Sequence, residues 1–474
     1  MKSTIFAISA ICLASLSWLP ANANPFLSEI TFALENNPQL VSSRHALSSA
    51  QTRAQAAQAS RLPTVNFGFD NGRERINSLP LATTQTIPGS PGTQVMSGQG
   101  SNWMSSNENR YGMSISSQIP VYNGGRLSAQ VEMANLDFLI AKHNAEGTIQ
   151  DTMLEAITAY LSVARANTLI ELSKQNEETT TQQLTLEMKR LEAGGGVKVD
   201  AMQAQTRLQI VRERSVYYKQ MLRDAVARYE QIFGHAPELE TVQDLDVYDA
   251  AIPATVAAAI GLASESNPRL SAAMLQVEKA QHQITVAQSA RLPSVDVIGS
   301  FNRNNNTSQT YQKEEAALFL RASWSINMGG EYQKRELAAV TDSQEASAKA
   351  DAVLSKVKES VRITWNQVVN GKERLQLLAN AANISRNVMM DRKVLRDAGK
   401  ETALAALDAE VEYFGVLSNK VNSMYDTRIG AYRLMAAMGK LSVQDIGLGA
   451  DFKLPVKPLI INVETLAQVG NSVK

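Results

Sequence analysis

The sequence predicts a mainly α-helical chain with a membrane β-barrel portion, built as a tandem duplication of one unit. Three observations support this fold class. The nonapeptide ASRLPTVNF at 59–67 returns as SARLPSVDV at 289–297, so a long segment occurs twice. Each copy contains stretches of alternating apolar and polar residues, typical of β-strands, followed by a stretch without proline that suits an extended helical rod. Aromatic residues make up only 6% of the chain, which favours packed rods over a bulky globular core.

Residues 1–23 have the pattern of a secretory signal peptide. An apolar run, Ile5–Leu19, precedes the small-x-small cleavage pattern Ala21–Ala23. A membrane anchor is the alternative, but the run is short and ends at Pro20. The single cysteine, Cys12, falls in this segment. The sequence therefore predicts a mature chain without disulfides or thiolate metal sites.

The duplication continues on both sides of the nonapeptides. Asn-Pro occurs upstream of each copy, in NPQL (37–40) and NPRL (267–270), and a Gly-Gly pair follows each downstream, in NGGRL (123–127) and MGGEY (328–332). The predicted domains are a first structural repeat at 24–235, a linker at 236–256, a second repeat at 257–440, and a segment with a C-terminal tail at 441–474.

Each repeat is expected to contain one β-hairpin, at about 64–122 and about 294–328. VNFGFD (65–70) in the first and LFLRASWSINM (318–328) in the second alternate between an apolar and a more polar face. Strands of about 9–11 residues can cross an outer membrane. Four strands cannot close, since bacterial single-chain barrels begin at about eight strands. Other copies of the chain are therefore expected to complete the barrel.

Long helical hairpins are predicted at 125–235 and 330–440. The roughly 65 residues after each Gly-Gly pair contain no proline, and an unbroken helix of that length spans about 100 Å. Apolar or small residues recur there at steps of four and three, the period of a coiled-coil seam. The predicted seam residues are Ile149, Met153, Ala156, Tyr160, Val163 and Ile170 in the first copy, and Leu354, Val361, Trp365, Val368 and Leu375 in the second.

The composition and motifs argue against several other classes of protein. With 46 basic and 46 acidic residues, nothing indicates a nucleic-acid partner. No metal-ligand spacing, nucleophile elbow or phosphate loop is present, so no catalytic residue, cofactor or metal is expected. A periplasmic coiled-coil scaffold without channel activity is the remaining alternative, and the predicted membrane-type strands argue against it. The histidines, which are expected to be solvated or packed, are His45, His143, His235 and His282.

The repeated Asn-Pro and Arg-Leu-Pro-x-Val motifs, the Gly-Gly pair after a strand and the glycine turn in mid-rod resemble the TolC family of outer-membrane efflux and type I secretion channels. The resemblance covers essentially the whole mature chain in family order. It implies a homotrimer in the cell outer membrane, with a shared twelve-stranded barrel, four strands per chain, contacting outer-membrane lipid. It further implies a long α-helical barrel in the periplasm, docked to a periplasmic adaptor protein and an inner-membrane ABC or RND-type pump. In the resemblance, the linker at 236–256 and the segment at 441–474 are equatorial, around the middle of this barrel. The chain itself is then a passive duct.

The resemblance implies that the turns at the helical tip contact the adaptor. These turns contain Gly194, Gly195 and Gly196 in the first copy and Gly399 in the second. A purely structural role is the alternative, because glycine is the usual residue where a helix ends with a positive φ.

The resemblance also implies a gate at the periplasmic entrance, formed by Asp200, Arg396, Glu401 and Asp408. Asp408 matches the inner of two acidic family positions, whereas the outer one is Ala405 here. Asp200 matches the acceptor of the family's latch. Arg396 and Glu401 stand where the family has a tyrosine and an arginine, so an Asp200–Arg396 pair is the expected replacement. A solvated carboxylate on a helix face is the alternative role for each acidic residue.

Overall fold

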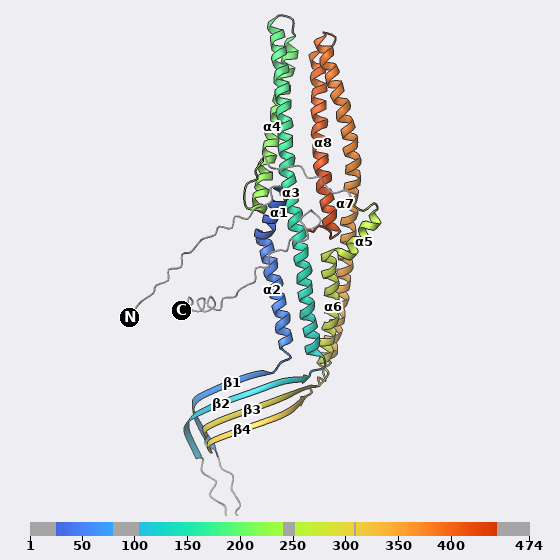
Figure 1. Cartoon of the computed structure of the whole chain (residues 1–474). Coiled ribbons are helices and arrows are strands. Elements are labelled where there is room, and N and C mark those ends of the chain that lie inside the picture. The colour runs from blue at the N-terminus through green and yellow to red at the C-terminus, as the bar shows by residue number, and fades with distance from the viewer. Residues whose placement is uncertain (1–24, 79–103, 240–251, 308–309, 443–474) are drawn as a thin grey trace, which may run out of the picture. The chain divides into compact units, whose positions relative to one another are not determined.

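The computed structural model describes residues 25–78, 104–239, 252–307 and 310–442. The predicted signal peptide, most of the predicted equatorial linker and nearly all of 441–474 lie outside these ranges. The same order of elements, two helices, two strands and two long helices, occurs twice (Figure 1). These elements are α1 (Pro25–Asn36), α2 (Pro38–Ala59), β1 (Thr64–Ser78), β2 (Met104–Tyr122), α3 (Arg126–Glu192), α4 (Lys198–Phe233), α5 (Val256–Ser266), α6 (Pro268–Ser289), β3 (Ser294–Thr307), β4 (Thr310–Ser323), α7 (Glu331–Asp397) and α8 (Ala403–Ala437).

The described residues form two compact units, and each unit combines segments from both sequence repeats. Among the described residues, the first comprises 25–45, 143–239, 252–271 and 353–442, and the second comprises 46–78, 104–142, 272–307 and 310–352. The repeats are therefore units of sequence, whereas the compact units are formed by pairing equivalent parts of the two copies.

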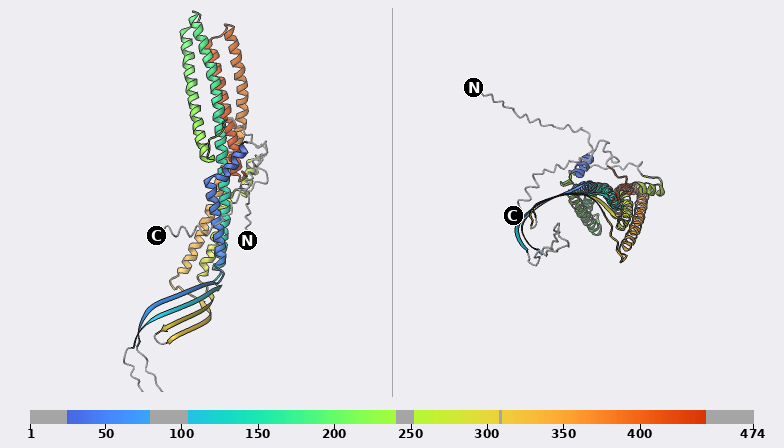
Figure 2. Two further views of the ribbon diagram at one scale, coloured as in Figure 1. Left: turned by 60° about the vertical axis from the view of Figure 1, so that its left-hand side comes forward. Right: turned by 90° about the horizontal axis from the view of Figure 1, so that it is seen from below.

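The strands form one curved antiparallel sheet in the order β1-β2-β3-β4 (Figure 2). Phe67 pairs with Ile115, Ile115 with Phe301, and Phe301 with Ala316, so these residues share one face across all four strands. Their neighbours along each strand point to the opposite, polar face. The predicted fold class, mainly helical with four strands per chain, is confirmed at this level.

The strand β4 is shorter than the alternation of its sequence suggests. Its last pairing joins Ser323 to Ser294, and Pro293 precedes the partner strand. Proline offers no N–H to a ladder, which explains why pairing stops here. Trp324 therefore lies beyond the strand, and its indole Nε1 donates a hydrogen bond to the carbonyl oxygen of Arg291 at 3.0 Å.

The Asn-Pro motif begins a helix in each repeat. The helices α2 and α6 start at Pro38 and Pro268, and proline suits the first helical position because no intrahelical donor is needed there. The side chain of Asn267 accepts hydrogen bonds from the backbone N–H groups of Arg269 and Leu270, as an N-cap does. Its Nδ2 donates to the carbonyl oxygen of Ala437 at 2.9 Å, which ties the start of α6 to the end of α8.

The rods α3 and α7 are each 67 residues long without a break. Among the described helices, none is apolar enough over sufficient length to cross a membrane. In the first unit, both rods contribute to one core with α1, α4, α5 and α8. Its largest fully buried side chains include Met153, Tyr160, Tyr229, Phe233 and Leu434.

Candidate functional site

The two tip turns close the helical hairpins with the same backbone geometry. At the end of α7, Lys400 N–H donates to the carbonyl oxygen of Leu395 at 2.8 Å, and Gly399 N–H donates to that of Arg396 at 2.9 Å. These are the two bonds of a Schellman motif, which requires a left-handed residue. Gly399 has φ 72° and Gly194, which ends α3, has φ 77°.

The remaining glycines of the first tip turn differ in their structural constraints. A Cβ on Gly196 would lie 2.7 Å from the backbone nitrogen of Leu191, so a side chain cannot be accommodated without movement. A Cβ on Gly195 would meet nothing within 4 Å, and Gly195 has no positive φ. Gly195 is therefore the tip glycine whose identity the fold does not explain.

The structure does not bring the predicted pair Asp200 and Arg396 together. Asp200 lies in the first turn of α4, where a carboxylate is favoured by the helix dipole, and its side chain has no bonded partner among the described residues. Arg396 is buried and donates to the side-chain oxygen of Gln183 on α3 and to Asp397. Glu401 accepts a hydrogen bond from Arg392 at 2.9 Å.

Asp408 connects the two helical hairpins. Its Oδ1 lies 2.7 Å from the guanidinium Nη2 of Arg207, so the ion pair joins α8 to α4. The Asp408 and Arg207 side chains are 52% and 34% exposed, and partly exposed pairs of this kind contribute only about 0.2–1 kcal/mol.

The seam of α3 changes from apolar to polar along the rod. Leu169 is fully buried and Ile170 only half-buried, so the predicted place of Ile170 in the seam is wrong by one residue. The small mismatch between 3.6 residues per turn and a strict 3.5 repeat explains this drift. Beyond Leu169 the buried positions continue at steps of four and three, but they hold Ser173, Asn176, Thr180, Gln183 and Glu187, which we call the polar seam.

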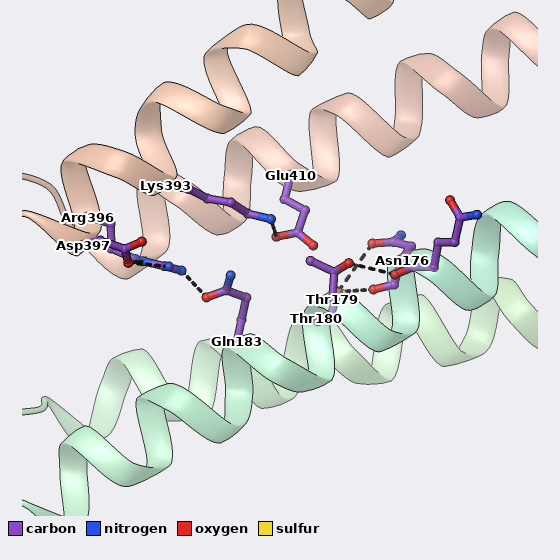
Figure 3. A network of polar contacts seen from close by, with 9 residues as sticks. Asn176, Thr179, Thr180, Gln183, Lys393, Arg396, Asp397 and Glu410 are labelled. Atoms are coloured by element: carbon purple, nitrogen blue, oxygen red, sulfur yellow. Dashed lines mark hydrogen bonds and ion pairs between the residues drawn. The ribbon is translucent and has the colours of Figure 1, made fainter.

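Glu410 of α8 faces the polar seam. Its side chain is 1% exposed, and neither carboxylate oxygen has a hydrogen-bond partner among the described residues. Figure 3 shows the carboxylate pointing from α8 toward Asn176 and Thr180 of α3, with Lys393 of α7 beside it. The Lys393 ammonium lies 3.6 Å away, beyond hydrogen-bond distance. Burial raises the pKa of Glu410, against the opposing effects of Lys393 and Arg396.

Sequence reasoning missed Arg207, Gln183, Lys393 and Glu410. The polar seam was the available signal, because Asn, Thr and Gln continue the heptad spacing of an apolar seam from Ser173 onward. Polar residues at seam positions weaken packing and mark places where the arrangement of helices is being specified.

No group of three or more His, Cys, Asp or Glu side chains in the described ranges could hold a metal ion. Two of the histidines have structural contacts. His143 is paired with Glu146 at 2.9 Å, and His235 packs edge-on against Phe32 and lies 3.1 Å from Glu29.

The chain is duplicated, its four strands form a sheet with one apolar face, and its long helices form two hairpins. This combination of features is typical of a class of outer-membrane channel proteins. The chain belongs to the outer membrane efflux protein family, whose model matches residues 30–235 and 259–440.

Similar proteins extend over nearly the whole chain. The outer membrane efflux protein BepC of Brucella suis is 22% identical over 428 residues, 88% of this chain and 85% of the relative. The outer membrane protein TolC of Vibrio cholerae is 23% identical over 426 residues, 87% of this chain and 90% of the relative. The solved structure of the outer-membrane channel OprN has a TM-score of 0.75 at 19% identity, covering 89% of this chain and 91% of that one. The Campylobacter jejuni CmeC channel has a TM-score of 0.72 at 14% identity, covering 93% and 94%.

Proposed function

We propose that this chain is the outer-membrane exit duct of a tripartite efflux or type I secretion system, passively conducting cargo from an inner-membrane pump to the exterior. The observation that carries the proposal is the sheet. Its apolar face is exposed, with Phe67, Leu318 and Leu320 each more than two-thirds accessible. In lipid such a face is favourable, whereas a periplasmic scaffold would leave it in water.

The sheet also indicates how copies assemble. Within the described sheet, β1 and β4 are each paired along one edge only. Open edges are not tolerated in the hydrocarbon region, so β4 of one copy is proposed to pair with β1 of the next. Three copies then form a twelve-stranded barrel.

Exposed apolar stripes on the helices support the same assembly. On α7, Ile363, Leu377 and Ile384 lie at multiples of seven residues and are between 49% and 65% exposed. On α4, Val199, Met202 and Ile210 are likewise exposed. These stripes are the seams that neighbouring copies would cover to form the helical barrel. Outer-membrane extraction followed by heat-modifiable migration of a trimer tests this assembly, and a soluble monomer by light scattering would refute it.

The proposed gate lies near the tip, where Asp408 and Arg207 join the hairpins. Asp408, which the resemblance assigns to the inner acidic position, accepts a hydrogen bond from Arg207, and Arg396 ties α7 to α3 through Gln183. Glu401, which stands where the family has an arginine, accepts a hydrogen bond from Arg392. Asp200, with no bonded partner in the described part of its own chain, is proposed to find one on a neighbouring copy.

Asp408→Asn and Arg207→Gln are each expected to raise the resting conductance of the channel in planar bilayers. Loss of about 0.2–1 kcal/mol shifts the opening equilibrium of each chain by up to about fivefold. The double variant should raise the resting conductance little beyond either single variant, because both substitutions break the same ion pair. Asp224→Asn, which changes an exposed aspartate on the same helix as Arg207, is the matched control. Additive effects of the two single variants would show that the ion pair does not hold the gate.

Gly195→Trp is expected to abolish export while trimers remain in the outer membrane. The proposed adaptor contacts the tip turns, and a bulky side chain at a position without backbone constraint blocks that contact without distorting the turn. Gly195→Ala is the control and should leave export intact. Normal export by the Gly195→Trp variant would place the adaptor elsewhere.

A further inference from the structure

A buried carboxylate without hydrogen bonds is costly unless it is neutral. Moving an ionised carboxylate out of water costs several kcal/mol, and a buried partner offsets this only when further hydrogen bonds satisfy the remaining oxygens. Glu410 has one cation at 3.6 Å and no hydrogen bond to either oxygen within the described structure. The packed arrangement of α8 on α3 therefore favours the protonated form.

We propose that Glu410 is a protonation-dependent clasp between the two helical hairpins, packed against the polar seam when its carboxyl group carries a proton and loosened when it is ionised. Hydrated separation of α8 from α3 gives the ionised carboxylate the water that the packed state denies it. The seam adjusts to either state, because its Asn, Thr and Gln side chains can bond to water or to the helix backbone. Thr180, for example, donates to the carbonyl oxygen of Asn176 at 2.8 Å.

The charged groups around Glu410 set the strength of the clasp. From α7 they are Lys393 and Arg396, both of which favour the ionised form. From α3 the facing residues Asn176, Thr180 and Gln183 are neutral, and Glu187 nearer the tip is bonded to Arg190 at 3.0 Å. From α4 the nearby cation is Arg207, which forms an ion pair with Asp408. On α8 itself, Glu412 is exposed to solvent. Burial outweighs these cations, so the pKa of Glu410 lies above its ordinary value.

The direction of the pH dependence follows from this raised pKa. The packed state holds the proton more tightly than the loosened state. The resulting stabilisation of the packed state over the loosened state is complete below the ordinary pKa of glutamate, about 4.3. This stabilisation is lost as the pH rises through the raised pKa that Glu410 has in the packed state. Over that interval the loosened population grows about tenfold per pH unit.

Hydrogen–deuterium exchange of the purified trimer tests the clasp without any measurement of transport. Peptides covering the polar seam are followed from about pH 4 to 8 and corrected for intrinsic exchange. In the wild type, their corrected exchange is expected to accelerate about tenfold per unit by which the pKa is raised. Glu410→Gln, which mimics the protonated side chain, should hold the slow acidic rate at every pH. Glu412→Gln, a neutral change at an exposed position of the same helix, should retain the wild-type profile.

Lys393→Met provides a second variant if Glu410→Gln does not assemble. Removing this cation disfavours the ionised carboxylate, so the exchange profile should move to higher pH. A flat wild-type profile, an unchanged profile in Glu410→Gln, or no shift in Lys393→Met would overturn the clasp.

An effect of the clasp on conductance would rest on the proposed function. Channel conductance is therefore measured separately on the same variants. Exchange that follows Glu410 while conductance does not would retain the clasp and count against the gate. If conductance responds to Asp408→Asn and the exchange profile does not follow Glu410, the gate is retained and the clasp is overturned.

Discussion

Gly439→Ala is expected to prevent stable assembly, whereas Gly234→Ala is tolerated. Both glycines follow the last helix of a repeat with similar backbone angles, φ 72° and 79°. An alanine at such an angle costs about 1–2 kcal/mol. At Gly234 a Cβ meets nothing within 4 Å, so this strain is the whole cost. At Gly439 the Cβ would collide with the carbonyl of Ser266 and lie 2.8 Å from the Cα of Asn267, both of which are backbone.

The collision at Gly439 cannot be relieved by rotating a side chain. Asn267 is held by its bonds to Arg269, Leu270 and Ala437, and Gln150 donates to the carbonyl oxygen of Gly439 itself at 3.0 Å. Overpacking of this kind adds about 1–3 kcal/mol or more per chain, and a trimer carries it three times. The stability of both variants is measured by the temperature at which the trimer dissociates on a gel. Equal losses for Gly234→Ala and Gly439→Ala would show that the close approach does not matter.

Leu320→Arg is expected to remove the protein from the outer membrane fraction, whereas Phe319→Arg leaves it there. Leu320 pairs with Val297 on the apolar face, and its neighbour Phe319 points to the opposite face. An arginine on a lipid-facing position costs up to about 2–4 kcal/mol at the bilayer midplane, again in each of three copies. On the polar face the natural Arg321 already accompanies Phe319.

The two arginine variants share one strand and a comparable increase in charge, so they differ in the face alone. Membrane fractionation and heat-modifiable gel migration report insertion and trimer formation together. Loss of both variants would indicate a general weakness of β4, and retention of Leu320→Arg would argue against contact of this face with lipid.

The sequence predicted much of the local structure because the strongest signals are local. The Gly-Gly pairs and the tip glycines mark the ends of α3 and α7, and alternation predicted the strands. The predicted seam matches the buried residues near Tyr160. At Ile170 it is displaced by one residue from the buried Leu169, because helical drift accumulates over several turns. The extra alternation after Ser323 was not strand, because its partner begins only after Pro293.

The candidate gate was less accessible to sequence reasoning, because its contacts join residues far apart in the chain. Arg207 and Asp408 form their pair across two hairpins, and no local pattern indicates which of several arginines an aspartate selects. The expected pair of Asp200 with Arg396 is not formed within the described part of the chain, where Arg396 is bonded to Gln183 instead. Glu410 has no local signal in the sequence, because its importance depends on which helix covers the polar seam.

The pairing of β2 with β3 has an evolutionary consequence. It joins the two copies of the duplicated unit within one chain, with the same antiparallel geometry that joins the strands within each hairpin. A half-length ancestor with one hairpin could have closed an equivalent ring as a hexamer of identical subunits. In the duplicated chain the equivalent positions of the two copies are free to differ, and Glu410 corresponds to the uncharged, exposed Gln205 in the first copy. Six identical hairpins would share one mobility, whereas the two hairpins of this chain differ in sequence and so need not move alike.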